Sequence, residues 1–289
     1  MDSMSPIERS LGQALRLAHA ADGPPSLAAA MRYAVFPGGA RIRPRLCLAV
    51  ARACADDRPG LSAAMAVAIE LMHCASLVHD DLPCFDDAPT RRGRASVHKA
   101  FGEPIAVLAG DALIVLAFQF LADAGRGAPA RLPAMIGIVA RAAGAPHGIT
   151  AGQAWESEKD IALAAYQRAK TGALFAAATA GGACAAGHAE RSWHPLGERI
   201  GEAYQIADDI RDVVSNERDL GKPVGRDASL GRPNAVASFG LRGAVARLED
   251  LVASAIAAIP PCPGALELRA HITAEASRLL PRELARPAA

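Results

Sequence analysis

The chain has 289 residues, of which 51% are hydrophobic and only 4% aromatic, and its formal net charge is +1. A charge so close to zero excludes the strongly basic surface of most nucleic-acid-binding proteins. Hydrophobic side chains that are mostly Ala, Leu, Val and Ile favour packed helices over a β-sandwich. Because no Ser/Gly-rich linker, charge run or fixed-period repeat interrupts the chain, we expect a single domain over residues 1–289.

The cysteines and the N-terminus predict a cytoplasmic protein. There is no CxxC pair and no His/Cys cluster with zinc-ligand spacing, so we expect reduced thiols that act as small hydrophobic side chains. The first residues show no basic region followed by an apolar one, which predicts that no signal peptide is present. The cysteines are Cys47, Cys54, Cys74, Cys84, Cys184 and Cys262.

An apolar segment, Leu61 to Val78, is predicted to form a helix that leads into a first acidic cluster, His79 to Asp87. Asp80 and Asp86 are six residues apart, roughly 240° around a regular helix, so they cannot share one helix face. Pro83 also disfavours helix, because it lacks an amide hydrogen and clashes with the preceding turn. We therefore expect the helix to end after the second aspartate and a loop to fold Asp86 back.

The other aspartates of the first cluster and the two arginines after it have different expected roles. Asp81 is expected to stay with Asp80 at the end of the helix, whereas Asp87 is expected to be solvated. Arg91 and Arg92 follow closely and supply positive charge.

The next segment, Pro104 to Ala122, is nearly all apolar and long enough to resemble a membrane span. It carries Gly110-Asp111 at its centre, and an aspartate in mid-bilayer costs about 2.5–3.5 kcal/mol. We therefore predict a helix that is buried inside a large bundle and is hydrophobic on all sides for that reason.

A second acidic cluster, Gln205 to Asp212, lies about 120 residues after the first. Asp208 and Asp212 are four residues apart and share one helix face, with Asp209 at its edge. Such a stack of carboxylates repels itself unless a cation lies between them. Mg²⁺ takes oxygen ligands and often joins one or two carboxylates to substrate phosphates, and arginine or lysine side chains bind phosphate oxygens. The two clusters and the basic residues beside them therefore predict a magnesium-dependent diphosphate site.

The ordered set of motifs resembles the trans-polyprenyl diphosphate synthases. Asp80-Asp81 with Asp86 is similar to the first aspartate-rich motif of that family, in its longer form DDxxxxD, and Asp208 to Asp212 is similar to the second, DDxxD. A lone DDxxD is a weak signal, but the full set is specific, and the resemblance runs from about residue 30 to 240. The other motifs are Gly38 to Pro44, Gly152-Gln153, Lys170-Thr171-Gly172 and Gly221 to Asp227.

The resemblance implies an all-α fold, one large helical bundle around a central cavity, and a homodimer. It also implies that the enzyme joins an allylic diphosphate (dimethylallyl, geranyl or farnesyl) to isopentenyl diphosphate with Mg²⁺ as cofactor. Ionisation of the allylic diphosphate comes first, isopentenyl diphosphate then attacks, and a proton is lost. No side-chain nucleophile is needed, because catalysis comes from charge stabilisation and orientation.

The roles of individual residues follow from the same resemblance. The metal ligands would be Asp80, Asp81, Asp86, Asp208 and Asp212. The allylic diphosphate or its metals would be held by Arg91, Lys170, Thr171, Gln205, Lys222 and Arg226. Isopentenyl diphosphate would be held by Arg43, His73 and Arg92. Gln153 is expected to line the cavity, with structural pairing as the alternative for it and for Gln205.

Three departures from the family pattern matter. Ala40 stands where the family usually has lysine, although Arg41, Arg43 and Arg45 lie nearby and one of them could compensate. Glu156 stands where aspartate is commoner. The C-terminal residues 277–289 do not show a clear terminal basic cluster.

Product length is read from the residues before the first motif. Ala75 and Ser76 are small where farnesyl synthases of bacterial type carry a bulky aromatic, so the resemblance implies a C20 geranylgeranyl diphosphate synthase. The local sequence is most similar to synthases of carotenoid and bacteriochlorophyll pathways. The alternatives are a C15 farnesyl synthase, if Phe85 or Phe175 blocks the cavity, a terpene cyclase, and a silent partner subunit of a heteromeric synthase.

Overall fold

The structure is a computed structural model that describes residues 5–20, 22–160, 162–214 and 234–278. The described chain is almost entirely helical, as the composition predicts, with one two-stranded hairpin in which Thr90 pairs with Ala95. The elements up to the centre of the chain are α1 (Pro6–Leu17), α2 (Pro25–Val35), α3 (Ile42–Ala53), α4 (Pro59–Asp80), β1 (Thr90–Arg91), β2 (Arg94–Ala95), α5 (Val97–Phe101), α6 (Glu103–Gly125) and α7 (Leu132–Ala143).

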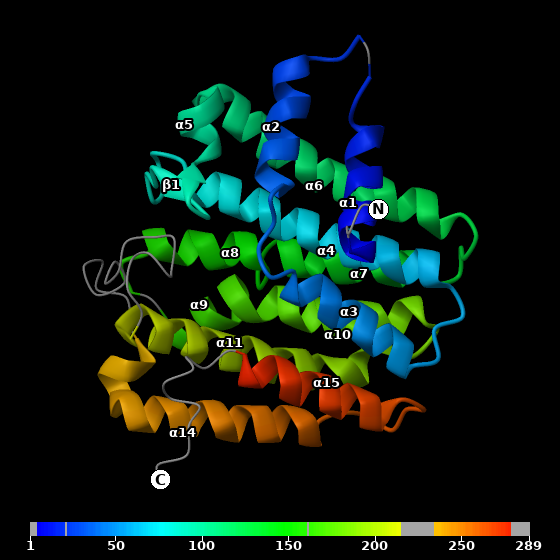
Figure 1. The fold of residues 1–289 in the computed structure, drawn as a ribbon, viewed down its shortest axis with the longest axis vertical. Helices are drawn as coiled ribbons and strands as arrows, with labels where there is room; N and C mark the ends of the chain where they lie inside the picture. The colour runs from blue at the N-terminus through cyan, green and yellow to red at the C-terminus, as the bar shows by residue number, and fades with distance from the viewer. Residues whose placement is uncertain (1–4, 21, 161, 215–233, 279–289) are drawn as a thin grey trace.

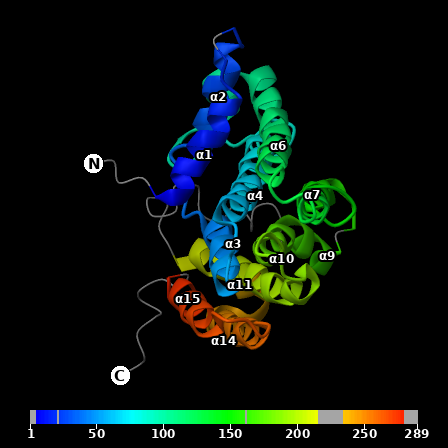
Figure 2. The ribbon, with the colours of Figure 1, turned by 90° about the vertical axis from the view of Figure 1, so that its right-hand side faces the viewer.

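The second half of the described chain continues the bundle. Its elements are α8 (Ile149–Ala154), η1 (Trp155–Ser157), α9 (Leu163–Gln167), η2 (Arg168–Gly172), α10 (Ala173–Ala185), η3 (Glu190–Trp193), α11 (His194–Val214), α14 (Ala235–Ala257) and α15 (Ala265–Ser277). Figure 1 shows α4, α10, α11 and α14 as successive, roughly parallel layers, with α1 and α2 crossing one end. Figure 2, at right angles, shows α7 and α9 on the side of α10 and α11 that faces away from α3.

The central helix is α10, which packs against α3, α4, α7 and α11. Every residue from Leu174 to Ala185 is buried, and most of them are alanine or glycine. Small residues let neighbouring backbones approach closely: a Cβ at Gly182 would lie 2.3 Å from the Cys47 carbonyl oxygen of α3. The run of small residues after Lys170 is therefore the packing core of the bundle.

The two apolar helices α4 and α6 form the most extensive helix pair, but they are buried to different degrees. Both are long and apolar enough to cross a membrane by length and composition alone, a weak criterion that core helices also meet. The apolar window of α4 is 83% buried, whereas that of α6 is only 39% buried.

The prediction that the segment Pro104 to Ala122 is hydrophobic because it is buried on all sides is therefore wrong. One face of α6 packs on α4, and the other exposes Leu108 and Val115, whose relative exposures are 51% and 65%. Asp111, which argued against a membrane span, lies on this exposed side, and its carboxylate comes within 3.7 Å of the His79 ring.

Candidate active site

The first acidic cluster lies where α4 ends. The helix ends at Asp80, and Asp81 is its C-terminal cap. The following loop turns back, because the amide of Asp86 donates to the carbonyl of Asp80 at 3.0 Å and the amide of Ala88 donates to that of Asp81 at 3.1 Å. The predicted end of the helix and the predicted return of the loop are both observed.

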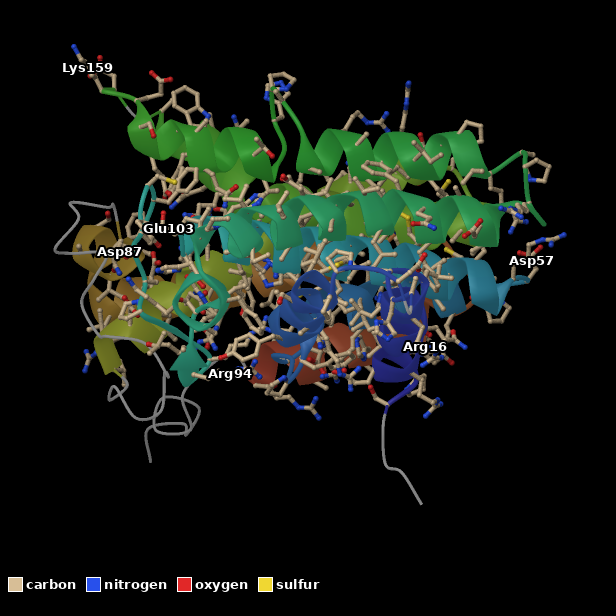
Figure 3. All side chains as sticks on the ribbon, turned by 90° about the horizontal axis from the view of Figure 1, so that it is seen from above. Arg16, Asp57, Asp87, Arg94, Glu103 and Lys159 are labelled. Carbon is tan, nitrogen blue, oxygen red and sulfur yellow. The ribbon has the colours of Figure 1, made fainter. Side chains whose placement is uncertain are left out.

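The last aspartate of the loop is placed as the sequence predicted. Asp87 is 59% exposed and pairs with Lys99 at 3.1 Å, so it is solvated. Figure 3 shows Asp87 and Lys159 toward one end of the bundle and Asp57, which precedes α4, at the other.

Asp80 and Asp81 are buried carboxylates. Burial raises the pKa of Asp80; the Lys170 ammonium works against this rise, while the nearby charges of Asp86 and Glu156 add to it. Burial also raises the pKa of Asp81, although the Arg91 guanidinium opposes this, with its Nε 3.0 Å from Asp81 Oδ1. Carboxylates held in this way gain from a cation, because the charged form is short of compensating charge.

Lys170 reaches this cluster from the π-helical turn η2. Its Nζ lies 3.5 Å from Asp80 Oδ1 and 2.6 Å from Glu156 Oε1. The Tyr166 hydroxyl donates to the same Glu156 oxygen at 2.7 Å. Sequence reasoning noted Glu156 only as a departure from the family pattern, but the structure shows it as the partner that orients Lys170. Fourteen residues separate the two along the chain, so no local pattern indicates the pair.

Gln153 lies beside the same carboxylate and is paired with the backbone, which fits the structural alternative for this residue. Its Nε2 donates to the Ser76 carbonyl at 2.9 Å and approaches Asp80 Oδ1 at 3.4 Å. Ala75, in the same turn of α4, is buried.

The two phenylalanines that could block the cavity differ in their surroundings. Phe85 is on the returning loop and is exposed, and Phe175 is covered by the Arg43 guanidinium, 4.5 Å from its ring centroid.

The second cluster lies near the end of α11. Asp208 pairs with Arg211 at 2.5 Å and Asp212 is buried, one turn away on the same helix. Asp209 is directed differently: it accepts from Gln205 Nε2 at 3.1 Å and from the Ala235 amide at 2.7 Å. Gln205 Oε1 in turn accepts from the Thr171 hydroxyl at 2.8 Å.

The turn η2 therefore joins the two clusters. Lys170 contacts Asp80 of the first cluster, and its neighbour Thr171 contacts Gln205 on the helix of the second. Lys222 and Arg226, which were also predicted to hold diphosphate, lie outside the described residues.

The residues predicted to hold isopentenyl diphosphate lie behind the first cluster. Arg43 is buried and stacks on Phe175, and burial lowers its pKa. Burial lowers the pKa of His73 well below its usual range, and the charges of Arg43 and Arg92 lower it further. Among the described residues, neither Arg43 Nε nor His73 Nδ1 has a hydrogen-bond partner. Buried donors of this kind fit an anionic ligand.

The arginines that could compensate for Ala40 are differently placed. Arg41 is buried and bonds Glu8 at 2.9 Å and Glu70 at 2.6 Å, and Arg45 bonds Glu275 at 2.7 Å. By contrast, a Cβ on Gly39 would lie 3.3 Å from the Arg92 guanidinium. Two guanidinium groups therefore lie beside the turn that lacks the lysine, Arg41 against Gly38 and Arg92 against Gly39, and Arg41 is already paired with two glutamates.

The donor set of the two clusters fits magnesium. Within the described ranges, no three His, Cys, Asp or Glu side chains gather closely enough to hold an ion alone. A Mg²⁺ at these carboxylates would need phosphate oxygens as further ligands, and Lys170 and Arg91 lie where they would contact such a phosphate.

A helical bundle with two carboxylate clusters joined by a basic turn defines an all-α isoprenoid synthase. A geranyltransferase structure from Helicobacter pylori, complexed with magnesium and isoprenyl diphosphate, matches with a TM-score of 0.79 at 26% identity and covers 96% of this chain and 100% of that chain. A geranylgeranyl pyrophosphate synthetase structure from Pyrococcus horikoshii matches with a TM-score of 0.74 at 26% identity, covering 92% and 93%. The chain belongs to the polyprenyl synthetase family, whose model matches residues 24–260.

The curated relatives are more similar in sequence. The chain is 53% identical over 279 residues to a geranylgeranyl diphosphate synthase of Cereibacter sphaeroides, covering 96% of this chain and 97% of the relative. It is 53% identical over 274 residues to a geranylgeranyl diphosphate synthase of Rhodobacter capsulatus, covering 95% of each. A farnesyl diphosphate synthase of Geobacillus stearothermophilus is 40% identical over 238 residues, with 78% and 80% covered. The expected family and the all-α fold are confirmed.

Proposed function

We propose that this protein is a magnesium-dependent prenyltransferase that condenses isopentenyl diphosphate with an allylic diphosphate to make geranylgeranyl diphosphate. The observation that carries the product is the 53% identity, over nearly the whole chain, to two geranylgeranyl diphosphate synthases. Family membership supports the condensation, and the small residues Ala75 and Ser76 in the turn before Asp80 support a long product.

The catalytic assignment follows the geometry of the two clusters. Asp80, Asp81 and Asp86 on one side, and Asp208 with Asp212 on the other, would hold Mg²⁺ together with the diphosphate. When bound, Mg²⁺ neutralises the charge that develops on the departing diphosphate. Lys170 and Arg91 add fixed positive charge at the first cluster, so they stabilise the same developing charge.

The second substrate is assigned to three basic side chains near the first cluster. Arg43, His73 and Arg92 would bind the isopentenyl diphosphate, and the contact of Arg92 with Gly39 brings positive charge to the turn that lacks a lysine at position 40. His73 has a lowered pKa and is therefore neutral at pH 7, so it can donate a hydrogen bond without adding charge.

The exposed face of α6 supports a homodimer. Leu108 and Val115 lie one to two helical turns apart on this face, and both are large apolar side chains in contact with solvent. A second copy that packs α6 against α6 would bury this face. The composition supports a cytoplasmic enzyme, and the resemblance supports a role in carotenoid or bacteriochlorophyll synthesis.

Product analysis tests the function. Purified protein is incubated with Mg²⁺, labelled isopentenyl diphosphate and each allylic primer in turn, and the products are separated by chain length. A C20 main product is expected. A main product of C15 would indicate a farnesyl synthase, and no product from any primer would indicate a partner subunit of a heteromeric enzyme.

Light scattering tests the dimer. The wild type should have twice the mass of one chain, and Val115→Asp should shift it to one chain, whereas Val213→Asp, also exposed but on α11, should not. A monomeric wild type would exclude the α6 interface.

A further inference from the structure

Asp209 belongs to the second aspartate motif but occupies a different position from its neighbours. It is 3% exposed, and its two carboxylate oxygens accept hydrogen bonds from two different elements. Oδ1 accepts from Gln205 Nε2 in the preceding turn of α11, and Oδ2 accepts from the amide of Ala235 at 2.7 Å. Ala235 is the first residue of α14, whose backbone leaves helical geometry five residues later, at Gly240.

In its contact with α14, the Asp209 carboxylate accepts a hydrogen bond from the first amide of that helix. The first amides of a helix have no partner inside it, and a carboxylate there supplies the missing acceptor. Asn234 caps the next amide, that of Val236, at 2.8 Å. Asp209 and Asn234 together therefore fix the point at which the chain enters α14, directly after the segment that contains Lys222 and Arg226.

The bond to Gln205 sets the direction of a longer chain of hydrogen bonds. A carboxylate only accepts, so the amide nitrogen of Gln205 must face Asp209 and the amide oxygen must face away. That oxygen accepts from the Thr171 hydroxyl at 2.8 Å. Thr171 lies on η2, next to Lys170, whose Nζ is 3.5 Å from Asp80 Oδ1. Asp209 is thus connected through two side chains to the turn that reaches both clusters.

We propose that Asp209 is a positioning residue: through Gln205 and Thr171 it holds the turn η2, and with it Lys170, in place for the allylic diphosphate. This inference rests on the proposed function. It divides the work of two adjacent carboxylates, because Asp208 is assigned to metal and Asp209 to a structural chain that ends at the diphosphate-binding turn.

The test exchanges the amide and the carboxylate. Asp209→Asn turns an acceptor into a donor at the Gln205 bond, and Gln205→Glu places two carboxylates against each other. When both substitutions are combined, the carboxylate now at position 205 accepts from the amide now at position 209 and still accepts from Thr171. The chain of hydrogen bonds is thereby restored with reversed polarity and the same total charge. The Michaelis constants for the allylic diphosphate and for isopentenyl diphosphate are measured separately, well below the melting temperature.

Each single variant should raise the Michaelis constant for the allylic diphosphate by roughly 2- to 30-fold, the range for indirect coupling between sites. That for isopentenyl diphosphate should stay within roughly twofold of wild type, since the chain ends at η2. The double variant should recover most of the loss. Without substrate, amide exchange at Ala235 should be only slightly faster in Asp209→Asn, because the remaining amide oxygen still accepts but carries no charge, and unchanged in Gln205→Glu.

Two controls separate this from loss of metal or of packing. Asp208→Asn should raise the Mg²⁺ concentration needed for half-maximal rate, whereas Asp209→Asn should not. Glu202→Gln removes another link between α11 and α14, the 2.8 Å pair with Arg247, and should leave both Michaelis constants unchanged.

Equal rises in both Michaelis constants, a raised Mg²⁺ requirement in Asp209→Asn, or a double variant no better than the singles would overturn the proposal. If Asp209→Asn does not fold, recovery of the allylic Michaelis constant in the double variant relative to Gln205→Glu decides, because Gln205 is itself predicted to hold the diphosphate and its single variant does not separate the two roles. A wild type that condenses no allylic diphosphate would instead refute the proposed function.

Discussion

The two aspartate clusters have similar sequences but different surroundings. Asp80 and Asp81 lie where α4 ends, both are buried, and the chain after them is free to fold another aspartate back. Asp208 and Asp209 lie within the described length of α11, where adjacent side chains point about 100° apart. Asp208 is 41% exposed at its side chain, whereas Asp209 is directed toward α14. The comparison shows that the two carboxylates at the end of α4 both face cationic side chains, Lys170 and Arg91, whereas those within α11 are divided between Arg211 and the start of α14.

Removal of single carboxylates is the strongest way to break this comparison. Asp80→Ala and Asp208→Ala should each leave the helical fold intact and lower turnover by about 100- to 1,000-fold, because developing charge on the diphosphate loses its compensation. Circular dichroism checks the fold and steady-state kinetics check the turnover. Asp87→Asn, in the same loop but exposed, should retain near-normal activity. Activity in excess EDTA, or near-normal turnover in either alanine variant, would refute the metal assignment.

Product length gives a second test of the difference between the two clusters. Only the first cluster is preceded by small residues that are predicted to line the cavity. Ala75→Tyr adds a ring where the third and fourth isoprene units must lie, and overpacking costs about 1–3 kcal/mol, roughly 5- to 150-fold against the longer chain. The main product should shift from C20 to C15 while total condensation continues. Ala75→Ser is the matched control and should keep the C20 product. A main C20 product from the tyrosine variant would show that Ala75 is not the floor.

Restoring the lysine that the family usually has at position 40 should have a smaller effect, on the binding of isopentenyl diphosphate. Arg41 lies against Gly38 of the same turn, but Arg41 and Arg45 are both engaged with glutamates, so we expect Arg92, beside Gly39, to replace the lysine. Ala40→Lys should therefore lower the Michaelis constant for isopentenyl diphosphate by about two- to fivefold, the range of an exposed ion pair. The constant for the allylic substrate serves as the internal control. An unchanged or raised value for isopentenyl diphosphate would mean that Arg92 already satisfies the site.

The smallest effect concerns the pH dependence of stability. Burial and neighbouring arginines lower the pKa of His73 in the folded state below its usual value of 6.5. The stability that neutral His73 gives to the folded protein is therefore present above about pH 6.5. It is lost as the pH falls toward the folded pKa, because the unfolded chain binds the proton first. When the pH is lowered from 7.5 to 5, the melting temperature of His73→Gln should fall less than that of the wild type. Each kcal/mol of unfolding free energy that His73 loses corresponds to about 2–4 °C. His19→Gln, on an exposed residue, should match the wild type.

The sequence predicted what depends on local spacing. The end of α4 at Asp80, the returning loop and the exposure of Asp87 all follow from periodicity and Pro83, and they are observed. The Glu156–Lys170 pair and the link from Asp209 to Ala235 join residues 14 and 26 positions apart, and such contacts depend on how helices pack.

The prediction that α6 is buried on all sides was wrong because burial, too, depends on how helices pack. Composition reports how apolar a helix is, and it does not distinguish a helix covered by its own chain from one that awaits a partner. The exposed side chains Leu108 and Val115 become visible only once α4 is seen to cover one side alone.

The π-helical turn η2 has a consequence for how the chain tolerates insertions and deletions. In this turn the Ala173 amide bonds to the Arg168 carbonyl, five residues earlier, so the helix holds one residue more than a regular turn needs. One surplus residue is a phase difference of about 100° between α9 and α10. Deletion of Ala169 would join α9 and α10 into one regular helix. The residues of α9 would then rotate by about 100°, which would separate Tyr166 from Glu156. The pairing of Tyr166 with Glu156, the partner of Lys170, thus depends on a one-residue surplus, so the length of this segment matters as well as its composition.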